Sequence, residues 1–355
     1  MEGKHYINGI GIITPQKTFA NEESLDDVTS YHGNVLRCIT PDFKSFINPT
    51  QLRRLSRMLR IGLTSSILCL KDAGAKMPDS IITATGYGFL EETEKFLREI
   101  LDRGEKQLTP TFFMQGTYNA LAGLVALSLK CTGYNSTYVS RGFAFENALN
   151  DGLMQITENP SSTVLIGAYD EAAGVQYKTG LRHGHYKSEA IDSLQLFETG
   201  TSGTIQGEGA AFFFMTGTRV ANTWCEVMDL RTEFKPTYEE LSDALHSFLS
   251  KNQMRLSEID LLVSGVSGDV ERDQMLLKLR KTSLRNIAEI RFKHLCGEYC
   301  TAISFAMWLG STIFKKQVIA DAIKVAGEKY PSKIETILIL NHYLGRNWSF
   351  VLLRR

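Results

Sequence analysis

The sequence predicts an α/β protein made of two similar halves. Short apolar, β-branched runs typical of buried strands alternate with segments whose apolar residues recur every three or four positions, as on one face of a helix. The same order of strands and helices starts again after Thr216-Gly217-Thr218. With 43% hydrophobic residues, a chain of 355 residues can bury a substantial core. We therefore expect an N-terminal half over residues 1–218 and a C-terminal half over residues 219–355.

The first half should begin with a buried strand at Tyr6–Ile13, where apolar positions are closely spaced. A long amphipathic helix is expected to open after Asn48-Pro49-Thr50 and to end at Gly74. Its polar face carries four arginines, at positions 53, 54, 57 and 60. The remaining expected elements of this half are strands at Ser80–Thr85, Thr137–Ser140, Thr163–Ala168 and Ala211–Met215, and helices at Tyr118–Lys130 and Ala144–Thr157.

The second half repeats this order and closes with two strands near enough in sequence to form a hairpin. Its expected strands are Trp224–Leu230, Ile259–Ser264, Glu289–Phe292, Glu335–Leu340 and Trp348–Arg354, and its expected helices are Tyr238–Lys251, Gln274–Lys281 and Thr301–Phe314. Strands separated by helices favour mostly parallel sheets covered on both faces, because a parallel connection needs a crossover. Such an architecture hosts many chemistries, so function must be argued from the site.

Charge and composition exclude several classes of function. The 39 Lys and Arg residues balance the 39 Asp and Glu residues without long blocks of one sign, whereas a dedicated nucleic-acid binder needs a basic face. No stretch approaches the roughly 18 consecutive apolar residues of a membrane span, and the first residues lack the apolar region of a signal peptide. Six scattered cysteines fit reduced thiols. We expect a soluble cytoplasmic protein without nucleic-acid or membrane partners.

Six motifs distributed over the whole chain follow a known order. They are Ile7–Pro15 with a G-x-G-x-x-T-P turn, Gly86–Leu97 after the second strand, Thr109–Phe113 followed by Asn119–Gly123, Gly207–Phe214 with the sequence G-E-G-A-A, Leu256–Val263, and Phe292-Lys293 with Gly297. In this order they resemble the β-ketoacyl synthases, the condensing enzymes of the thiolase superfamily. The resemblance implies a thiolase fold, in which two βαβαβαββ halves form a layered α-β-α-β-α structure.

The resemblance also implies where the chemistry should lie, and the catalytic residues are missing there. In this family a cysteine thiolate at a sharp strand-to-helix turn holds the acyl group, and the matching turn places Gly142 at that position. Two histidines polarise the thioester carbonyl and stabilise the enolate, and the matching positions hold Gly265 and Glu298. Lys293 of the second histidine motif is retained. We therefore expect no catalytic residue at this site.

With three catalytic groups absent, the chain most resembles the chain-length factors, which pair with an active ketosynthase and limit the length of its product. The resemblance implies a role in fatty-acid, aryl-polyene or flexirubin-type polyketide biosynthesis. It implies a ketosynthase or a second copy as the partner subunit, an acyl carrier protein as a further partner, and no cofactor. Candidate residues for the wall of the partner's acyl tunnel are Phe112, Phe113, Met114 and Tyr118, with Phe143 and Phe145 near the nucleophile turn. For any one of these residues, filling the core is the commoner role.

Two alternatives remain open. The chain could be an active acyltransferase or hydrolase that uses Ser140 or a cysteine supplied by the tertiary structure, although neither His294 nor His342 matches a catalytic histidine of the family. It could also be a homodimer that binds acyl carrier protein or lipid without a ketosynthase.

The remaining polar motifs have simpler interpretations. His183-Gly184-His185 and Cys296-x-x-x-Cys300 lack the spacing of metal ligands, so no metal is expected. The arginine stripe is either a solvated face or a contact for an acidic acyl carrier protein. Asp170-Glu171 is given no catalytic role.

Overall fold

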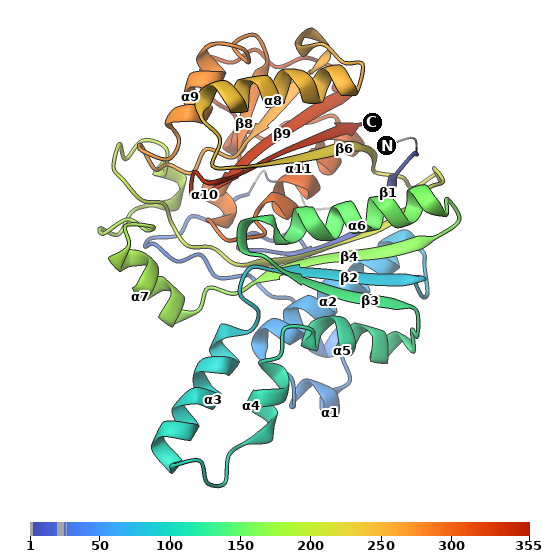
Figure 1. Ribbon diagram of the computed structural model, residues 1–355, viewed down its shortest axis with the longest axis vertical. Coiled ribbons are helices and arrows are strands. Elements are labelled where there is room, and N and C mark those ends of the chain that lie inside the picture. The colour runs from blue at the N-terminus through green and yellow to red at the C-terminus, as the bar shows by residue number, and fades with distance from the viewer. Residues whose placement is uncertain (1–2, 20–24, 26) are drawn as a thin grey trace.

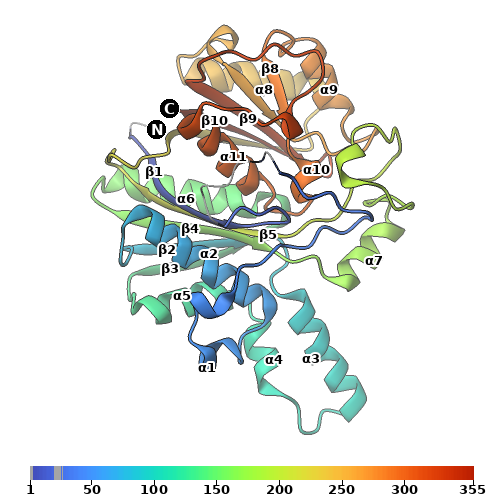
Figure 2. The same ribbon diagram turned by 180° about the vertical axis from the view of Figure 1, so that it is seen from behind.

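The computed structural model describes residues 3–19, 25 and 27–355, and its elements stack in the order helix, sheet, helix, sheet, helix (Figures 1 and 2). The strands are β1 Tyr6–Ile13, β2 Ser80–Thr85, β3 Tyr134–Val139, β4 Thr163–Asp170, β5 Gly209–Thr216, β6 Cys225–Phe234, β7 Leu261–Ser264, β8 Ala288–Arg291, β9 Thr336–Tyr343 and β10 Asn347–Arg354. The helices are α1 Pro49–Leu52, α2 Arg57–Ala73, α3 Leu90–Arg103, α4 Pro110–Gln115, α5 Ala120–Leu129, α6 Ala144–Glu158, α7 Gly174–Arg182, α8 Tyr238–Lys251, α9 Gln274–Lys281, α10 Lys293–Cys296 and α11 Ile303–Lys316.

The strand order shows the internal repeat directly. Hydrogen bonding runs β3-β2-β4-β5-β1-β6-β10-β9-β7-β8, so each half has the order third, second, fourth, fifth, first. The halves meet between β1 and β6 through two residue pairs, Tyr6 with Glu226 and Ile7 with Cys225. The duplicated α/β architecture predicted from the sequence is therefore present. The boundary expected after residue 218 falls in the loop between β5 and β6.

Three apolar clusters fill the spaces between the layers. The outer face of the N-terminal half packs against α2 and α5 through residues such as Ile81, Leu165 and Phe212. The outer face of the C-terminal half packs against α8 and α9 in the same way. Between the two half-sheets, α6 and α11 share the largest cluster, to which both halves contribute. Burial of these clusters is the main favourable contribution to folding.

Local sequence explains where several helices start and stop. Helix α8 begins with a capping box, in which the Thr237 hydroxyl accepts from the Glu240 backbone N–H and the Glu240 carboxylate accepts from that of Thr237. Helix α2 ends at Gly74, whose φ of 64° is a left-handed conformation that glycine adopts without a steric penalty.

Three expectations need correction. The sheets are mixed and not mostly parallel, because β1, β5, β6 and β10 form antiparallel pairs while β2 and β7 pair in parallel with their neighbours. The helix expected from position 50 to Gly74 is interrupted between α1 and α2, so Arg53 and Arg54 lie in a turn. Helix α3 was not predicted, and it forms with α4 a hairpin that projects from the body (Figures 1 and 2).

Within the described part of the chain, no helix combines the length and apolar character needed to cross a bilayer.

Candidate functional site

The turn after β3 carries the residue expected at the nucleophile position. Gly142 lies in a short 3-10 turn, Arg141–Phe143, that leads into α6, and it is buried. A Cβ added to Gly142 would lie 2.7 Å from Cδ1 and 2.8 Å from Cβ of Tyr343, at the end of β9. Carbon atoms do not approach so closely without displacement. The Tyr343 side chain thus fills the space that a side chain at position 142 would need.

The first expected histidine position is filled in the same manner. Gly265 directly follows β7, and a Cβ there would lie 2.4 Å from Oδ1 and 2.7 Å from Cα of Asn341. The backbone of β9 is therefore packed against Gly265 and leaves no room for an imidazole.

Glu298, at the second expected histidine position, forms a buried ion pair with Lys293. Lys293 Nζ lies 2.7 Å from Glu298 Oε2 and donates a second bond, also 2.7 Å, to the backbone carbonyl of His342. Both side chains are almost fully buried. Burial raises the pKa of Glu298, and the charge of Lys293 opposes this rise. The retained lysine therefore holds a carboxylate and the end of β9 in place.

These three positions converge on one segment. Asn341, His342 and Tyr343, called here the β9 end, contact Gly265, Lys293 and Gly142 respectively. All three residues of the β9 end are buried, and His342 is completely inaccessible to solvent. The β9 end packs beside the three positions at which the sequence resemblance leads us to expect the family's cysteine and two histidines.

Both ring nitrogens of His342 take part in structural hydrogen bonds. Its Nε2 lies 2.9 Å from Asp273 Oδ1, and its Nδ1 accepts from the Gly345 backbone N–H at 3.1 Å, so Nε2 carries the proton. Asp273 also accepts from the hydroxyl and backbone N–H of Ser267. Burial opposes ionisation of Asp273, but the bond from His342 and its other donors keep its pKa below its ordinary value. Both ring nitrogens of His342 are occupied, so this residue is not available as a base.

The other possible nucleophiles and bases are also poorly placed. Cys300 Sγ packs against Gly86, and burial raises the pKa of this thiol well above its ordinary value, which keeps it protonated. The Ser140 hydroxyl accepts from the Asn147 side-chain amide at 2.9 Å. Burial lowers the pKa of His294 to about 4, and its Nε2 bonds to the Ala322 carbonyl. Among the described residues, no histidine is hydrogen-bonded to Ser140 or to Cys300.

Asp170, at the end of β4, ties the two halves together beside this volume. It accepts from the Thr85 hydroxyl, the Gly86 backbone N–H, and the hydroxyl and backbone N–H of Thr301 at 2.8–3.0 Å. Burial raises the pKa of Asp170 to about 6 despite these four bonds. Burial likewise raises the pKa of Glu171 to about 8. The geometry gives both carboxyls structural contacts.

No candidate metal centre emerges in the part of the chain that the structure describes, where no three His, Cys, Asp or Glu side chains gather. His183 and His185 lie at the end of α7 with ring centroids 5.9 Å apart. All six cysteines lie within the described residues and are unpaired.

The aromatic candidates for a tunnel wall separate into three environments. Phe113, Met114 and Tyr118 are more than half exposed on or just after α4. Phe112, also on α4, and Phe143 are half-buried. Phe145 is completely buried in the central cluster, with its ring 5.8 Å from that of Phe213.

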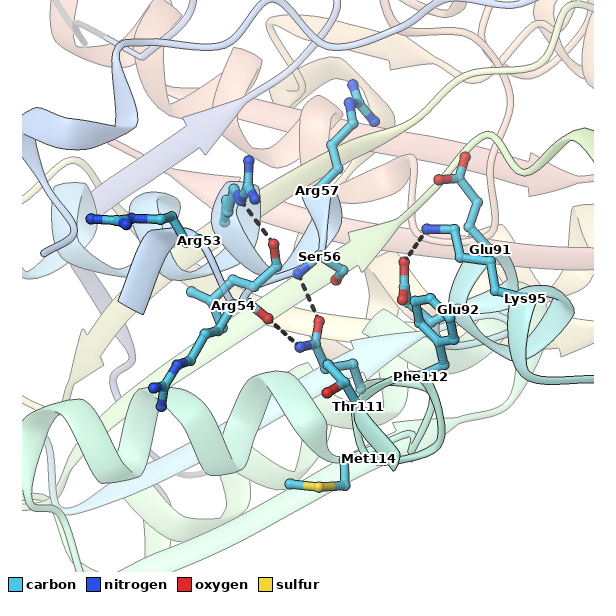
Figure 3. Close-up of a pocket in the computed structure, with 13 residues that line it drawn as sticks. Arg53, Arg54, Ser56, Arg57, Glu91, Glu92, Lys95, Thr111, Phe112 and Met114 are labelled. Atoms are coloured by element: carbon cyan, nitrogen blue, oxygen red, sulfur yellow. Dashed lines mark hydrogen bonds and ion pairs between the residues drawn. The ribbon is translucent and has the colours of Figure 1, made fainter. Parts of the chain in front are cut away.

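The arginine stripe lines a pocket of about 870 Å³ between the start of α2 and the α3–α4 hairpin (Figure 3). Arg57 reaches inward to Glu208 of the G-E-G-A-A motif, with Nη1 3.0 Å from Oε2, and Arg60 Nε donates to the Leu55 carbonyl. Arg53 and Arg54 are exposed, and no ion pair involves them within the described residues. Arg57 and Arg60 therefore make structural bonds, whereas Arg53 and Arg54 keep exposed side chains without ion pairs in the described part of the chain.

The Gln115 side chain fixes the break between α1 and α2 beside this pocket. Its amide oxygen accepts from the Ser56 backbone N–H at 2.7 Å, and its NH₂ group donates to the Arg54 carbonyl (Figure 3). These bonds hold Arg53 and Arg54 at the rim of the pocket.

Part of the chain is similar in sequence to β-ketoacyl synthases. A family model described as "Beta-ketoacyl synthase, N-terminal domain" matches residues 39–194. The 3-oxoacyl-(acyl-carrier-protein) synthase 2 of Staphylococcus aureus strain N315 is 19% identical over 205 residues, which are 54% of this chain and 50% of that protein. The chain thus spans about half the length of the curated relatives it matches.

Solved structures match the whole fold. The ishigamide ketosynthase/chain length factor superposes with a TM-score of 0.81 at 14% identity, covering 100% of this chain and 99% of that one. A β-ketoacyl synthase from Burkholderia phymatum STM815 gives 0.78 at 16% identity and 99% coverage of both chains. The chain therefore has the fold of these ketosynthase structures, which is the thiolase fold. The ketosynthase ApeO in complex with its chain length factor ApeC from Xenorhabdus doucetiae gives 0.74 at 14% identity, covering 99% and 98%.

The sequence predicts three substituted positions, at Gly142, Gly265 and Glu298, but sequence reasoning missed the segment that packs beside them. The expected strand ends at Leu340, so Asn341 and Tyr343 belong to no expected element. The available signal was the run Asn341-His342-Tyr343 between two apolar strands, because polar residues inside a buried region need partners.

Proposed function

We propose that this chain is a catalytically incomplete β-ketoacyl synthase homologue that acts as a chain-length-factor-like subunit. It pairs with an active ketosynthase in fatty-acid, aryl-polyene or flexirubin-type polyketide biosynthesis, in the cytoplasm, where reduced thiols suit its six unpaired cysteines. The observation that carries the proposal is the β9 end, which packs against Gly142, Gly265 and the Lys293–Glu298 pair. Condensation needs a nucleophile and donors for a developing oxyanion. The packing of the β9 end beside the three aligned positions supports the absence of these groups.

A partner subunit has a free sheet edge to bind. Strand β3 pairs with β2 on one side and ends the strand order on the other, and its residues are exposed or half-buried. Tyr134 and Val139 on β3 and Leu127 on the adjacent α5 expose large apolar side chains. An unpaired edge flanked by apolar groups is a surface that another chain can extend by strand pairing.

The exposed residues Phe113, Met114 and Tyr118 would then lie on a part of the molecule open to the partner. A ketosynthase's growing chain that reaches them would gain about 0.8 kcal/mol for each buried methylene until it meets a side chain. These residues, with Phe112 and Phe143, are our candidates for the wall that sets product length. Phe145, the sixth candidate, lies buried in the central cluster, against Phe213.

The test is to express the chain with an intact Cys-His-His ketosynthase and to assay condensation of malonyl units on acyl carrier protein, for each subunit alone and for the pair. We expect activity from the pair and none from this chain alone. Condensation by this chain alone, abolished by Cys300→Ala or Ser140→Ala, would instead establish an active acyltransferase.

The wall candidates are tested in the same assay. Phe113→Ala should lengthen the product while the heterodimer remains intact by size-exclusion chromatography with light scattering. Val220→Ala, which truncates an exposed apolar side chain between β5 and β6, is the matched control. Unchanged product length with a stable heterodimer would remove Phe113 from the wall.

Acyl carrier protein has a specific place to dock in this proposal. Arg53 and Arg54 present unpaired positive charge at the rim of the 870 Å³ pocket, and an acidic partner is attracted to such a surface. The double variant Arg53→Glu/Arg54→Glu should weaken carrier-protein binding and remove its salt dependence, whereas Arg285→Glu, on an exposed turn after α9, should not. Equal binding by both variants would place the carrier protein elsewhere.

A homodimer that binds acyl carrier protein is the second candidate function, because the β3 edge can also pair with its own copy. A stable dimer of the isolated chain that does not exchange subunits with a ketosynthase would favour this function over the heterodimer.

A further inference from the structure

A second, cationic pocket lies beside the Gly142 turn. It has a volume of about 460 Å³, and its lining includes three arginines and a histidine, namely Arg141, Arg272, Arg346 and His185. All its lining residues belong to the described chain, and none of them is Asp or Glu. The pocket therefore concentrates positive charge in a protein whose formal net charge is zero.

The charge of this pocket is only partly neutralised. Arg272 Nη1 lies 2.9 Å from Oδ2 of Asp269, which is not a lining residue of this pocket. Arg346 is exposed, and the guanidinium group of Arg141 lies 5.6 Å from the centre of the Tyr87 ring. Neither arginine forms an ion pair with any residue that the structure describes. The pKa of His185 is lowered by burial and then by the nearby charge of Arg272. Two arginine guanidinium groups are thus left to receive a negative group.

The backbone of Arg141 is held in an unusual conformation. Its φ is 53°, in the left-handed region that residues with a Cβ seldom adopt. Such residues cluster at ligand sites, where the surrounding structure holds them. Here the conformation places a charged residue, next to the buried Gly142, at the wall of the pocket.

An apolar pocket adjoins the cationic one. Its volume is about 260 Å³, and it shares Tyr87, His185 and Tyr343 with the cationic pocket. The rest of its lining combines the apolar or aromatic side chains of Leu90, Val175 and Tyr186 with Gly180 and three polar residues, Gln176, Thr179 and His183. The two pockets together offer guanidinium donors at one end and apolar surface at the other.

We propose that these adjoining pockets bind a small amphiphilic oxyanion, whose phosphate or carboxylate head contacts Arg141 and Arg346 and whose apolar body enters the pocket lined by Leu90, Val175 and Tyr186. Guanidinium groups form charge-assisted, often bidentate hydrogen bonds with both kinds of head group. The apolar surface supplies the remaining affinity. This site is independent of the partner and goes beyond the proposed function.

Isothermal titration calorimetry with simple probes tests the proposal on the full chain. The probes are hexyl phosphate, hexanoate, ethyl phosphate, inorganic phosphate and hexanol. We expect at least one of the two six-carbon anions to bind at least tenfold more tightly than hexanol and than inorganic phosphate. Each methylene that is buried should tighten binding about fourfold, so hexyl phosphate should exceed ethyl phosphate. A preference for hexyl phosphate would assign a phosphate ester, and a preference for hexanoate a carboxylate.

Variants separate this site from nonspecific binding. Arg141→Gln/Arg346→Gln should weaken binding of the six-carbon anion at least tenfold and reduce its salt dependence, with an unchanged circular dichroism spectrum. Arg285→Gln removes an exposed arginine that lines neither pocket and should leave binding unchanged. If the double variant loses its fold, Arg346→Gln alone serves, because this side chain is exposed. Binding of hexanol as tight as that of the anions, equal binding by variant and wild type, or no binding of either six-carbon anion would overturn the proposal.

Discussion

Glu146 offers a quantitative test of the central layer. It lies in the first turn of α6, is 1% exposed, and accepts a hydrogen bond from the Ser349 hydroxyl on β10, while its second carboxyl oxygen has no partner within the described structure. Burial raises its pKa from 4.5 to about 7, against the opposing effect of Ser349. The folded state therefore favours the protonated form more than the unfolded state does.

The sign of the pH effect follows from this difference. Below about pH 4.5 the carboxyl is protonated in both states and contributes no penalty. As the pH rises towards 7, the unfolded chain loses the proton first, so the free energy of unfolding decreases, and it levels off above 7. One pKa unit corresponds to 1.36 kcal/mol. Between pH 5 and pH 8 the penalty grows by about 2.5 kcal/mol.

The perturbation is Glu146→Gln, which keeps the shape of the side chain and removes its titration. We expect the free energy of unfolding of the variant, minus that of the wild type, to rise by about 2.5 kcal/mol from pH 5 to pH 8. The buried, unpaired amide of the variant lowers its free energy of unfolding by an amount that does not vary with pH. The pH dependence of the difference between variant and wild type therefore reports the titration of Glu146 alone. Urea denaturation followed by circular dichroism at several pH values measures it.

Glu158→Gln is the matched control, because Glu158 ends the same helix but is exposed. For this control, the free energy of unfolding of the variant minus that of the wild type should stay nearly constant from pH 5 to pH 8. A constant difference for Glu146→Gln as well would refute the reasoning, since it would mean that burial does not keep this carboxyl protonated in the folded protein.

Three further changes test the site itself. Lys293→Met leaves the Glu298 carboxyl buried without its cation, so we expect a loss of about 3–5 kcal/mol in urea denaturation, and adding Glu298→Gln should recover most of it. Gly142→Cys places a Cβ against the Tyr343 ring, so the chain should lose about 1–3 kcal/mol and remain inactive in condensation; formation of an acyl-enzyme, detected by mass spectrometry, would contradict this expectation. Phe145→Ala should cost about 3–5 kcal/mol of unfolding free energy, and a loss below about 1 kcal/mol would show that its ring is not part of the core.

The spacing of apolar residues predicted helices and strands well where an element is buried on one face or on both faces. The expected strands Tyr6–Ile13 and Ser80–Thr85 and the expected helices Tyr238–Lys251 and Gln274–Lys281 agree with the structure at both ends. In such segments the pattern of apolar residues is itself the cause of the structure, because each apolar position meets the core.

The break before α2 could not be predicted in this way. Apolar residues keep their helical spacing through it, and the bonds that interrupt the helix come from Gln115, 61 positions after Arg54. The packing of Tyr343 against Gly142 also could not be predicted from local sequence, because these two residues lie in different halves of the chain. A motif comparison predicts that a side chain is absent, but only the folded structure shows which residues pack beside that position.

The narrow junction between β1 and β6 contrasts with the large apolar cluster that α6 and α11 share. Continuity of the chain between β5 and β6 contributes little to holding the halves together, whereas each half by itself would expose the inner face of its sheet. Fragments 1–218 and 219–355 should therefore aggregate when produced separately and reassemble when co-produced, as a split protein does. The two halves are thus arranged like the subunits of a dimer that share one apolar interior.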